Sequence, residues 1–309
     1  MATKTGNERE YTAIRVATLR GDLQIPFDVY VLVAGKYILY CRRGDSFEGT
    51  RLQRLKAKNL KVMYVRNDDD VPYRQYLEQN IDQAYDAKTA KSIDSRAEVI
   101  QGFQQAVTEA FMENPLDQFA YQHARSSAQR FSEFLEREPL GAAAILKIKN
   151  VDESFSHHGV NVATLSVAMT LANGMRDGNL VHLMALGAFL HDTEHYFSAT
   201  DEKEAYRLHP LRGTHRFQGG QFLEQLVLNI ISQHEEYVNG TGFPKGLTEK
   251  EMDPLVIVAA TANAYERLIS FGSLSPKEAL RDLLIAKMGL YPLAHLQTLQ
   301  NLLKSYRFI

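Results

Sequence analysis

The stretch Leu183-Met184-Ala185-Leu186-Gly187-Ala188-Phe189-Leu190-His191-Asp192 decides the fold of the second half of the chain. Leu183, Leu186 and Leu190 recur at helical spacing, and this apolar stripe runs directly into an adjacent histidine and aspartate. Imidazole is a ligand for iron, manganese and zinc. A carboxylate beside it can bridge two ions while the imidazole binds one of them. The stretch therefore predicts an apolar helix that ends at a pair of metal ligands.

Other histidines are placed in the same way. Eight of the ten histidines lie between residues 157 and 234, beside acids and at helix ends. His157-His158 precedes a helical stripe, His209-Pro210 opens a further segment, and an apolar run leads into Gln233-His234-Glu235. Four helices that deliver such ends to one place would build a metal site inside a bundle. Two ions about 3.5–4 Å apart in such a site can share a hydroxide nucleophile and clamp a phosphate.

Composition and charge limit the classes of protein that fit. The 309 residues suffice for about two domains of roughly 150 residues each. The single cysteine, Cys41, excludes an intramolecular disulfide and a thiolate zinc cluster. No run approaches the roughly 18 apolar residues of a membrane span, and the polar start Met1-Ala2-Thr3-Lys4 lacks the apolar core of a signal peptide. The net charge of −2 argues against polymeric nucleic acid as a partner. We therefore expect a cytoplasmic protein with no membrane contact, whose charge is compatible with a small phosphate ester.

The first part of the chain predicts a small α+β module. Two β-rich runs, 27–33 and 36–40, flank the turn Ala34-Gly35, which suits a tight hairpin. A short helix over 51–58 and a strand over 62–65 follow. From about Tyr73 the pattern is helical, with a break at Asn114-Pro115. The segment Glu138-Pro139-Leu140-Gly141 is the predicted domain boundary. We expect the module over 1–88, a helical connector over 89–140 and a second domain over 141–309.

Five segments of the second domain, taken together, carry a resemblance. They are His158-Gly159-Val160-Asn161-Val162-Ala163, Leu190-His191-Asp192-Thr193-Glu194-His195, His209-Pro210 with Gly213, Gln233-His234-Glu235 with the loop 239–247, and Ala262-Asn263-Ala264-Tyr265-Glu266-Arg267-Leu268. In order and spacing they resemble the HD-GYP family, a branch of the HD phosphohydrolases that hydrolyses cyclic di-GMP. The resemblance implies an all-α HD-domain helical bundle at the C-terminus and, by analogy of architecture, a regulatory N-terminal module.

The resemblance also implies a site. It implies two metal ions, iron with manganese as the alternative, and a bridging hydroxide that attacks phosphorus. The implied metal ligands are His158, His191, Asp192, His209, His234 and Asn263. Asp192 would bridge the ions, and His195 would neutralise charge that develops on the phosphate. The implied substrate-binding residues are Phe243, Pro244, Lys245 and Arg267.

The sequence departs from the family pattern in ways that concern substrate more than metal. Phe243 stands where the family has its signature tyrosine, and Gln233 replaces the first of two adjacent histidines. Asn263 replaces the last metal aspartate, and His195 replaces a lysine. The Arg-Pro-Tyr-Lys stretch with which the family grips phosphates has no counterpart after Ile269.

The first ligand can be read in two registers. Some family members carry a glutamate four residues before the first histidine, which supports a third metal. That position is Ser154 if the ligand is His158, and Glu153 if it is His157. The segment after His158 fits the family better in the first register, which predicts two metals.

Three functions stay open at this point. The leading one is metal-dependent hydrolysis of cyclic di-GMP in bacterial second-messenger signalling. The second is a degenerate member that binds metal and nucleotide and signals through a protein partner without strong catalysis. The third is an HD hydrolase that acts on another nucleotide or phosphate ester.

Overall fold

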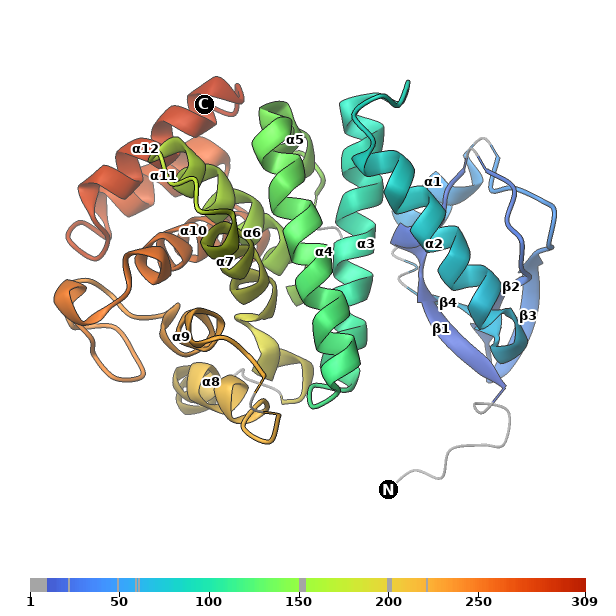
Figure 1. The fold of residues 1–309 in the computed structure, drawn as a ribbon, viewed down its shortest axis with the longest axis horizontal. Helices are drawn as coiled ribbons and strands as arrows, with labels where there is room; N and C mark the ends of the chain where they lie inside the picture. Colours follow the sequence, from blue (N-terminus) through green and yellow to red (C-terminus); the bar gives the residue numbers. More distant parts are fainter. Residues whose placement is uncertain are drawn as a thin grey trace. The chain divides into compact units, whose positions relative to one another are not determined.

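The computed structural model describes residues 10–21, 23–48, 50–58, 60, 62–149, 154–198, 202–220 and 222–309. The chain divides into two compact units, Met1–Ala106 and Val107–Ile309, which are drawn in Figure 1. Residues 1–9 of the predicted module lie outside the described residues. The predicted domain boundary near residue 140 stays a prediction.

The first unit is built on a four-stranded antiparallel sheet in the order β1-β4-β2-β3. Its strands are β1 Tyr11–Arg15, β2 Val29–Val33, β3 Lys36–Cys41 and β4 Val62–Arg66. The β2–β3 hairpin turns at Ala34 and Gly35, whose φ angles of 49° and 76° are both positive. A two-residue turn with both φ angles positive matches the twist of the flanking strands, as the sequence predicts.

One face of this sheet carries the core of the first unit. Phe27, Met63 and Val65 are completely buried there. Helices α1 Arg51–Ala57 and α2 Asp70–Tyr85 accompany the sheet, with the short 3-10 turns Val16–Thr18 and Asn67–Asp69. Tyr73 and Tyr76 of α2 meet the Phe27 ring edge-on, each at 5.4 Å between ring centroids. The unit is therefore the small α+β module that the sequence predicts.

The second unit is all-helical, as the sequence predicts. Helix α3 Ile93–Glu113 crosses from the first unit into the second. The others are α4 Gln118–Arg137, α5 Pro139–Leu146, α6 Phe155–Ala172, α7 Gly178–Leu190, α8 Lys203–His215, α9 Gln225–Gln233, α10 Pro254–Ser270, α11 Pro276–Ile285 and α12 Leu293–Ser305. Short 3-10 turns lie at η4 Thr193–Tyr196 and η5 Glu249–Glu251. No described helix is long and apolar enough to cross a membrane.

Helices α6 and α7 form the centre of this unit. They pack against each other, α6 also against α10, and α7 also against α4 and α9 (Figure 1). Nearly all residues of both helices are buried, so the two helices lie in the interior of the unit. A side chain at Gly159 would place its Cβ 3.0 Å from the Phe189 carbonyl oxygen. The absence of that side chain lets the start of α6 lie close to the end of α7, where the histidines are.

Candidate metal centre

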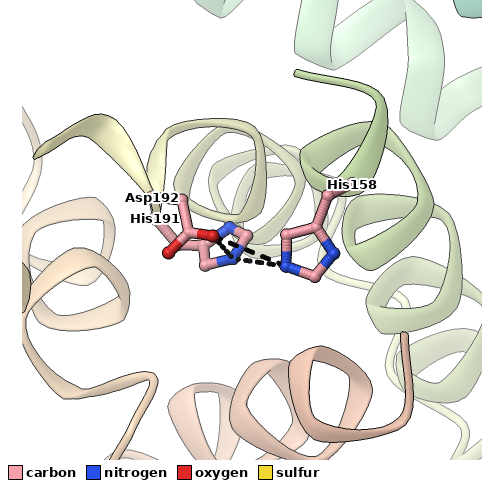
Figure 2. A group of neighbouring side chains, drawn as sticks. All are labelled: His158, His191 and Asp192. Carbon is pink, nitrogen blue, oxygen red and sulfur yellow. Dashed lines mark hydrogen bonds and ion pairs between the residues drawn. The ribbon is translucent and has the colours of Figure 1, made fainter. Parts of the chain in front are cut away.

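Asp192 is the centre of a buried cluster of imidazoles. Its carboxylate, with 3% of the side chain exposed, faces the four predicted histidine ligands, and also His195, through their Nε2 atoms. The Nε2 atoms of His158 and His191 lie 3.6 and 3.5 Å from Oδ2. Those of His209 and His234 lie 3.3 and 3.5 Å from Oδ1. Each carboxylate oxygen therefore faces two of the predicted histidine ligands, and Figure 2 shows the two at Oδ2.

The elements explain how these side chains meet. His158 lies in the first turn of α6, which Ser154 caps by accepting a hydrogen bond from the His157 N–H. His191 and His234 are the C-terminal caps of α7 and α9. His209 lies inside α8, directly before Pro210. His157, the other candidate for the first ligand, turns away, with its Nε2 at 3.0 Å from the Ile148 carbonyl oxygen.

Three of the four imidazoles are held by the main chain of their own helices. His191 Nδ1 donates to the Ala188 carbonyl at 2.7 Å, and His234 Nδ1 donates to the Ile231 carbonyl at 2.9 Å. His209 Nδ1 donates to the Tyr206 carbonyl at 2.6 Å. Pro210 has no N–H, so it leaves this carbonyl without its usual helical partner. A carbonyl only accepts, so each Nδ1 carries the hydrogen and each Nε2 keeps a lone pair directed at Asp192.

Such an arrangement of lone pairs fits a cation. His209 Nε2 lies 2.8 Å from His234 Nε2, and His158 Nε2 lies 3.2 Å from His191 Nε2. Among the described residues, neither Asp192 oxygen has a hydrogen-bond donor. Lone pairs and carboxylate oxygens that converge in a buried place repel each other unless a positive ion lies between them. The donor set therefore suits one divalent ion at each carboxylate oxygen.

The electrostatics favour an ionised Asp192 and neutral His191 and His195 imidazoles. Burial alone would raise the pKa of the Asp192 carboxyl, but the imidazoles around it, His191 and His195 foremost, hold that pKa well below its usual range. Burial lowers the pKa of His191 well below its ordinary value and that of His195 to about 4. Burial opposes protonation of His158 too, but the carboxylate of Glu266 raises the pKa of this imidazole.

Asn263 lies at the same centre with its amide oriented. Its Oδ1 is 3.0 Å from His158 Nε2, and its Nδ2 donates to Glu235 Oε1 at 3.3 Å. A carboxylate accepts and does not donate, so Glu235 fixes the nitrogen on its own side and turns the oxygen toward the cluster. Asn263 can therefore offer a neutral oxygen where the family has an aspartate.

His195 faces Asp192 from η4. Its Nε2 lies 3.6 Å from Asp192 Oδ1, and its ring stacks on Phe155 at 4.1 Å between centroids. Glu194, which precedes His195, is also buried, and its carboxylate accepts hydrogen bonds from Arg216 Nε at 2.9 Å and Ser198 Oγ at 2.7 Å.

The predicted substrate residues are placed at different depths. Arg267 of α10 reaches the centre, with its Nη1 atom 4.0 Å from both Asp192 Oδ2 and Glu235 Oε1. Among the described residues this atom has no hydrogen-bond acceptor. Phe243 lies beside Tyr206, with 5.6 Å between ring centroids, and next to it is the cis peptide bond before Pro244. Lys245 is exposed, and its N–H donates to Glu236 Oε1 at 2.6 Å.

Sequence reasoning missed four residues of this site. Glu235 could have been noticed because it follows His234, and Tyr206 because it precedes His209 by one helical turn. Tyr206 donates its hydroxyl hydrogen to Glu235 Oε1 at 2.8 Å. Arg207 lies with its guanidinium carbon 5.4 Å from the Phe243 ring centroid, and Glu266 lies behind His158. Glu266 lies in the fifth segment of the resemblance, three residues after Asn263, and could have been noticed there, whereas Arg207 has no signal in the sequence that separates it from a surface charge.

Three comparisons relate the chain to known proteins. Residues 183–287 match the family model HD_5, described as an HD domain. The cyclic di-GMP phosphodiesterase PA4108 of Pseudomonas aeruginosa is 26% identical over 159 residues. That match spans 48% of this chain and only 38% of PA4108. The solved structure of Bd1817, an HDG"Y"P protein from Bdellovibrio bacteriovorus, superposes with a TM-score of 0.89 and 43% identity. It covers 96% of this chain and 100% of the other.

Proposed function

Because the chain belongs to the HD-GYP family of HD-domain proteins, we propose that it is a metal-dependent phosphodiesterase that hydrolyses cyclic di-GMP. One observation carries the proposal. The Asp192 carboxylate is buried with each oxygen facing the Nε2 atoms of two predicted histidine ligands, which is the donor set of a centre for two divalent ions. The activity named for PA4108 supports the choice of reaction.

The proposed ligands fall into two groups that share Asp192. His158, His191 and Asn263 would hold one ion, and His209 and His234 the other. Iron is the proposed metal and manganese the alternative, since both accept imidazole and oxygen ligands. When bound, a pair of such ions supplies Lewis acidity toward the phosphate and a lower pKa for water.

Arg267 is the proposed phosphate contact of this chain. Its Nη1 atom lies 4.0 Å from Asp192 Oδ2 and has no hydrogen-bond acceptor in the part of the chain that the structure describes, and aromatic rings support its guanidinium. The guanidinium carbon lies 5.0 Å from the Tyr206 centroid and 5.7 Å from the Phe271 centroid. A guanidinium held in this way can donate two parallel hydrogen bonds to a phosphate. Arg267 would thus supply a positive charge that the missing Arg-Pro-Tyr-Lys stretch does not.

His195 has a different proposed role from the lysine that it replaces. A pKa of about 4 keeps this imidazole neutral near pH 7, so it adds no full positive charge to the site. With its ring clamped on Phe155, His195 would orient the phosphate by a hydrogen bond. Phe243, with Arg207 over its ring, would form a stacking edge at the rim for a guanine base.

One observation favours a second function. Compared with the family pattern, the neutral His195 supplies no positive charge toward the substrate, and the neutral Asn263 supplies no negative charge toward the metal. A member of the family that binds metal and nucleotide, and signals through a partner protein without strong catalysis, would need no more than this.

Turnover tests the proposal. We would load the protein with iron under anaerobic conditions and follow cyclic di-GMP, with cyclic di-AMP and a simple phosphodiester as alternative substrates. Hydrolysis of cyclic di-GMP that disappears in Asp192→Ala supports the proposal. Binding of cyclic di-GMP without turnover supports the signalling alternative. Turnover of the other substrates alone contradicts both and points to an HD hydrolase of different specificity.

A further inference from the structure

His158 differs from the other three imidazoles around Asp192 in what holds its Nδ1 atom. His191, His209 and His234 each donate to a neutral carbonyl of the preceding helical turn. His158 Nδ1 instead bonds to the carboxylate of Glu266, which comes from α10 and lies 108 residues away in the sequence. Both side chains are buried, at 0% and 2% exposure.

Glu266 is itself fixed by both of the helices that it joins. Its Oε1 accepts a hydrogen bond from Asn161 Nδ2 at 2.9 Å, and Asn161 lies one turn after His158 on α6. The same oxygen accepts from Ser270 Oγ at 2.5 Å, one turn after Glu266 on α10. The other oxygen, Oε2, faces His158. The carboxylate is therefore held in place before any ligand binds, and its rotation is more restricted than that of a surface glutamate.

A carboxylate behind an imidazole acts differently from a carbonyl. It accepts a charge-assisted hydrogen bond, and it increases the electron density that the opposite ring nitrogen offers to a metal. On the Oδ2 side of Asp192, His158 has this support. A cation on this side binds less favourably without that support, because Asn263 is a neutral ligand and the positively charged Arg267 guanidinium lies 4.0 Å from Oδ2.

We propose that Glu266 is a positioning residue that makes the two halves of the Asp192 centre unequal. It fixes the His158 ring with Nε2 toward Asp192 and strengthens this nitrogen as a ligand. The ion on the His158–His191 side depends on Glu266, and the ion on the His209–His234 side does not. This inference rests on the proposed metal centre.

The test is the variant Glu266→Gln, which removes the negative charge and keeps nearly the same side-chain shape. A glutamine can still accept from His158 through its oxygen. Its nitrogen would then face Asn161, whose Oδ1 has no partner among the described residues and can turn to accept. Manganese(II) alone serves as the probe, titrated into metal-free protein under anaerobic conditions and followed by calorimetry and electron paramagnetic resonance.

We expect the wild type to bind two ions and Glu266→Gln to weaken one of them by about 10–100-fold. The affinity for the other ion should change by less than about twofold. Glu224→Gln is the matched control, because Glu224 is a half-buried carboxylate that Tyr121 and Arg125 of α4 hold by hydrogen bonds, with no contact to the cluster among the described residues. It should leave both affinities unchanged.

Nitrogen-15 resonances of the histidines in the metal-free wild type give a second readout that needs no variant. We expect His158 to carry its hydrogen on Nδ1, with a downfield proton shift from the bond to Glu266. A hydrogen on Nε2 with none on Nδ1 would overturn the inference. So would two bound ions whose affinities stay the same, or fall equally, in Glu266→Gln. A wild type that binds no ion overturns the proposed function instead, while the resonances still decide which nitrogen Glu266 engages.

Discussion

Arg267 Nη1 lies 4.0 Å from Asp192 Oδ2, so a guanidinium shares the interior of the site with the carboxylate that both proposed ions would use. The HD-GYP pattern has a small residue at this position, and its own cations come from elsewhere in the sequence. Burial opposes a charge on Arg267, but Asp192 and the neighbouring acids outweigh it and raise the pKa of the guanidinium. The group therefore stays charged and available to an anion.

Replacing Arg267 with alanine should weaken the binding of the substrate phosphate and leave the binding of metal unchanged. One charge-assisted hydrogen bond contributes about 1.5–3 kcal/mol, so we expect cyclic di-GMP to bind about 10–150-fold more weakly. Calorimetry on the metal-loaded protein measures this. Arg281→Ala, an exposed arginine on α11, is the control for loss of charge. Equal weakening in both variants would contradict a direct contact.

Asp192→Ala should remove both ions, since Asp192 is the carboxylate that the two groups of candidate ligands share among the described residues. We expect metal content to fall from about two ions per chain to fewer than one after dialysis, measured by elemental analysis on anaerobically loaded protein. Retention of two ions would show that the imidazoles suffice without a bridging carboxylate.

The intact protein should bind cyclic di-GMP weakly compared with a family member that has the full motif set. Losing two cations costs on the order of 3–6 kcal/mol, or roughly two to four decades in affinity, of which Arg267 restores a part. Phe243→Tyr adds one hydroxyl, worth only about 0.5–1.5 kcal/mol net, so its dissociation constant should improve by less than about 15-fold. A submicromolar dissociation constant for the unmodified protein would contradict this prediction.

Glu224 should make the stability of the helical unit depend on acid pH. Although burial opposes it, hydrogen bonds from Tyr121 and Arg125 lower the pKa of Glu224 below its ordinary value of 4.5. A lowered pKa in the folded state stabilises the protein fully above about pH 4.5, and this stability is lost as the pH falls through the folded-state value. The pair is partly exposed, so we expect a contribution of about 1 kcal/mol.

Chemical denaturation of the wild type and of Glu224→Gln at several pH values measures this contribution. The difference in unfolding free energy should be constant between pH 6 and 8 and shrink below about pH 4.5. A difference that grows on acidification would reverse the sign and contradict the ion pair as its source.

The sequence predicts most of the fold because its periodic segments are long. The apolar stripes that end at His191 and His234 predict the central helices, and the hairpin at Ala34-Gly35 predicts β2 and β3. Strand β1 was not predicted. Tyr11–Arg15 has no apolar run, and its strand conformation is stabilised by pairing with β4, more than forty residues away.

The site was predicted in part, for a similar reason. The candidate ligands His158, His191, His209 and His234 converge on Asp192 in the structure, and their binding of metal stays a prediction. Glu266 lies in the fifth segment of the resemblance, but its contact with His158 could not be predicted, because it depends on which face of α10 meets α6. The packing of two helices far apart in sequence brings the two side chains together.

Pro210 has a consequence for how this centre can change over evolutionary time. By freeing the Tyr206 carbonyl, it ties the orientation of His209 to the main chain. The carbonyls of Ala188 and Ile231 do the same for His191 and His234. Anchors made of backbone atoms survive substitution of the side chains around them. Substitutions around such a centre therefore affect recognition of the substrate before they change the orientation of the imidazoles. The lysine, tyrosine and aspartate of the family pattern can be replaced, as at His195, Phe243 and Asn263, while these three imidazoles keep their orientation.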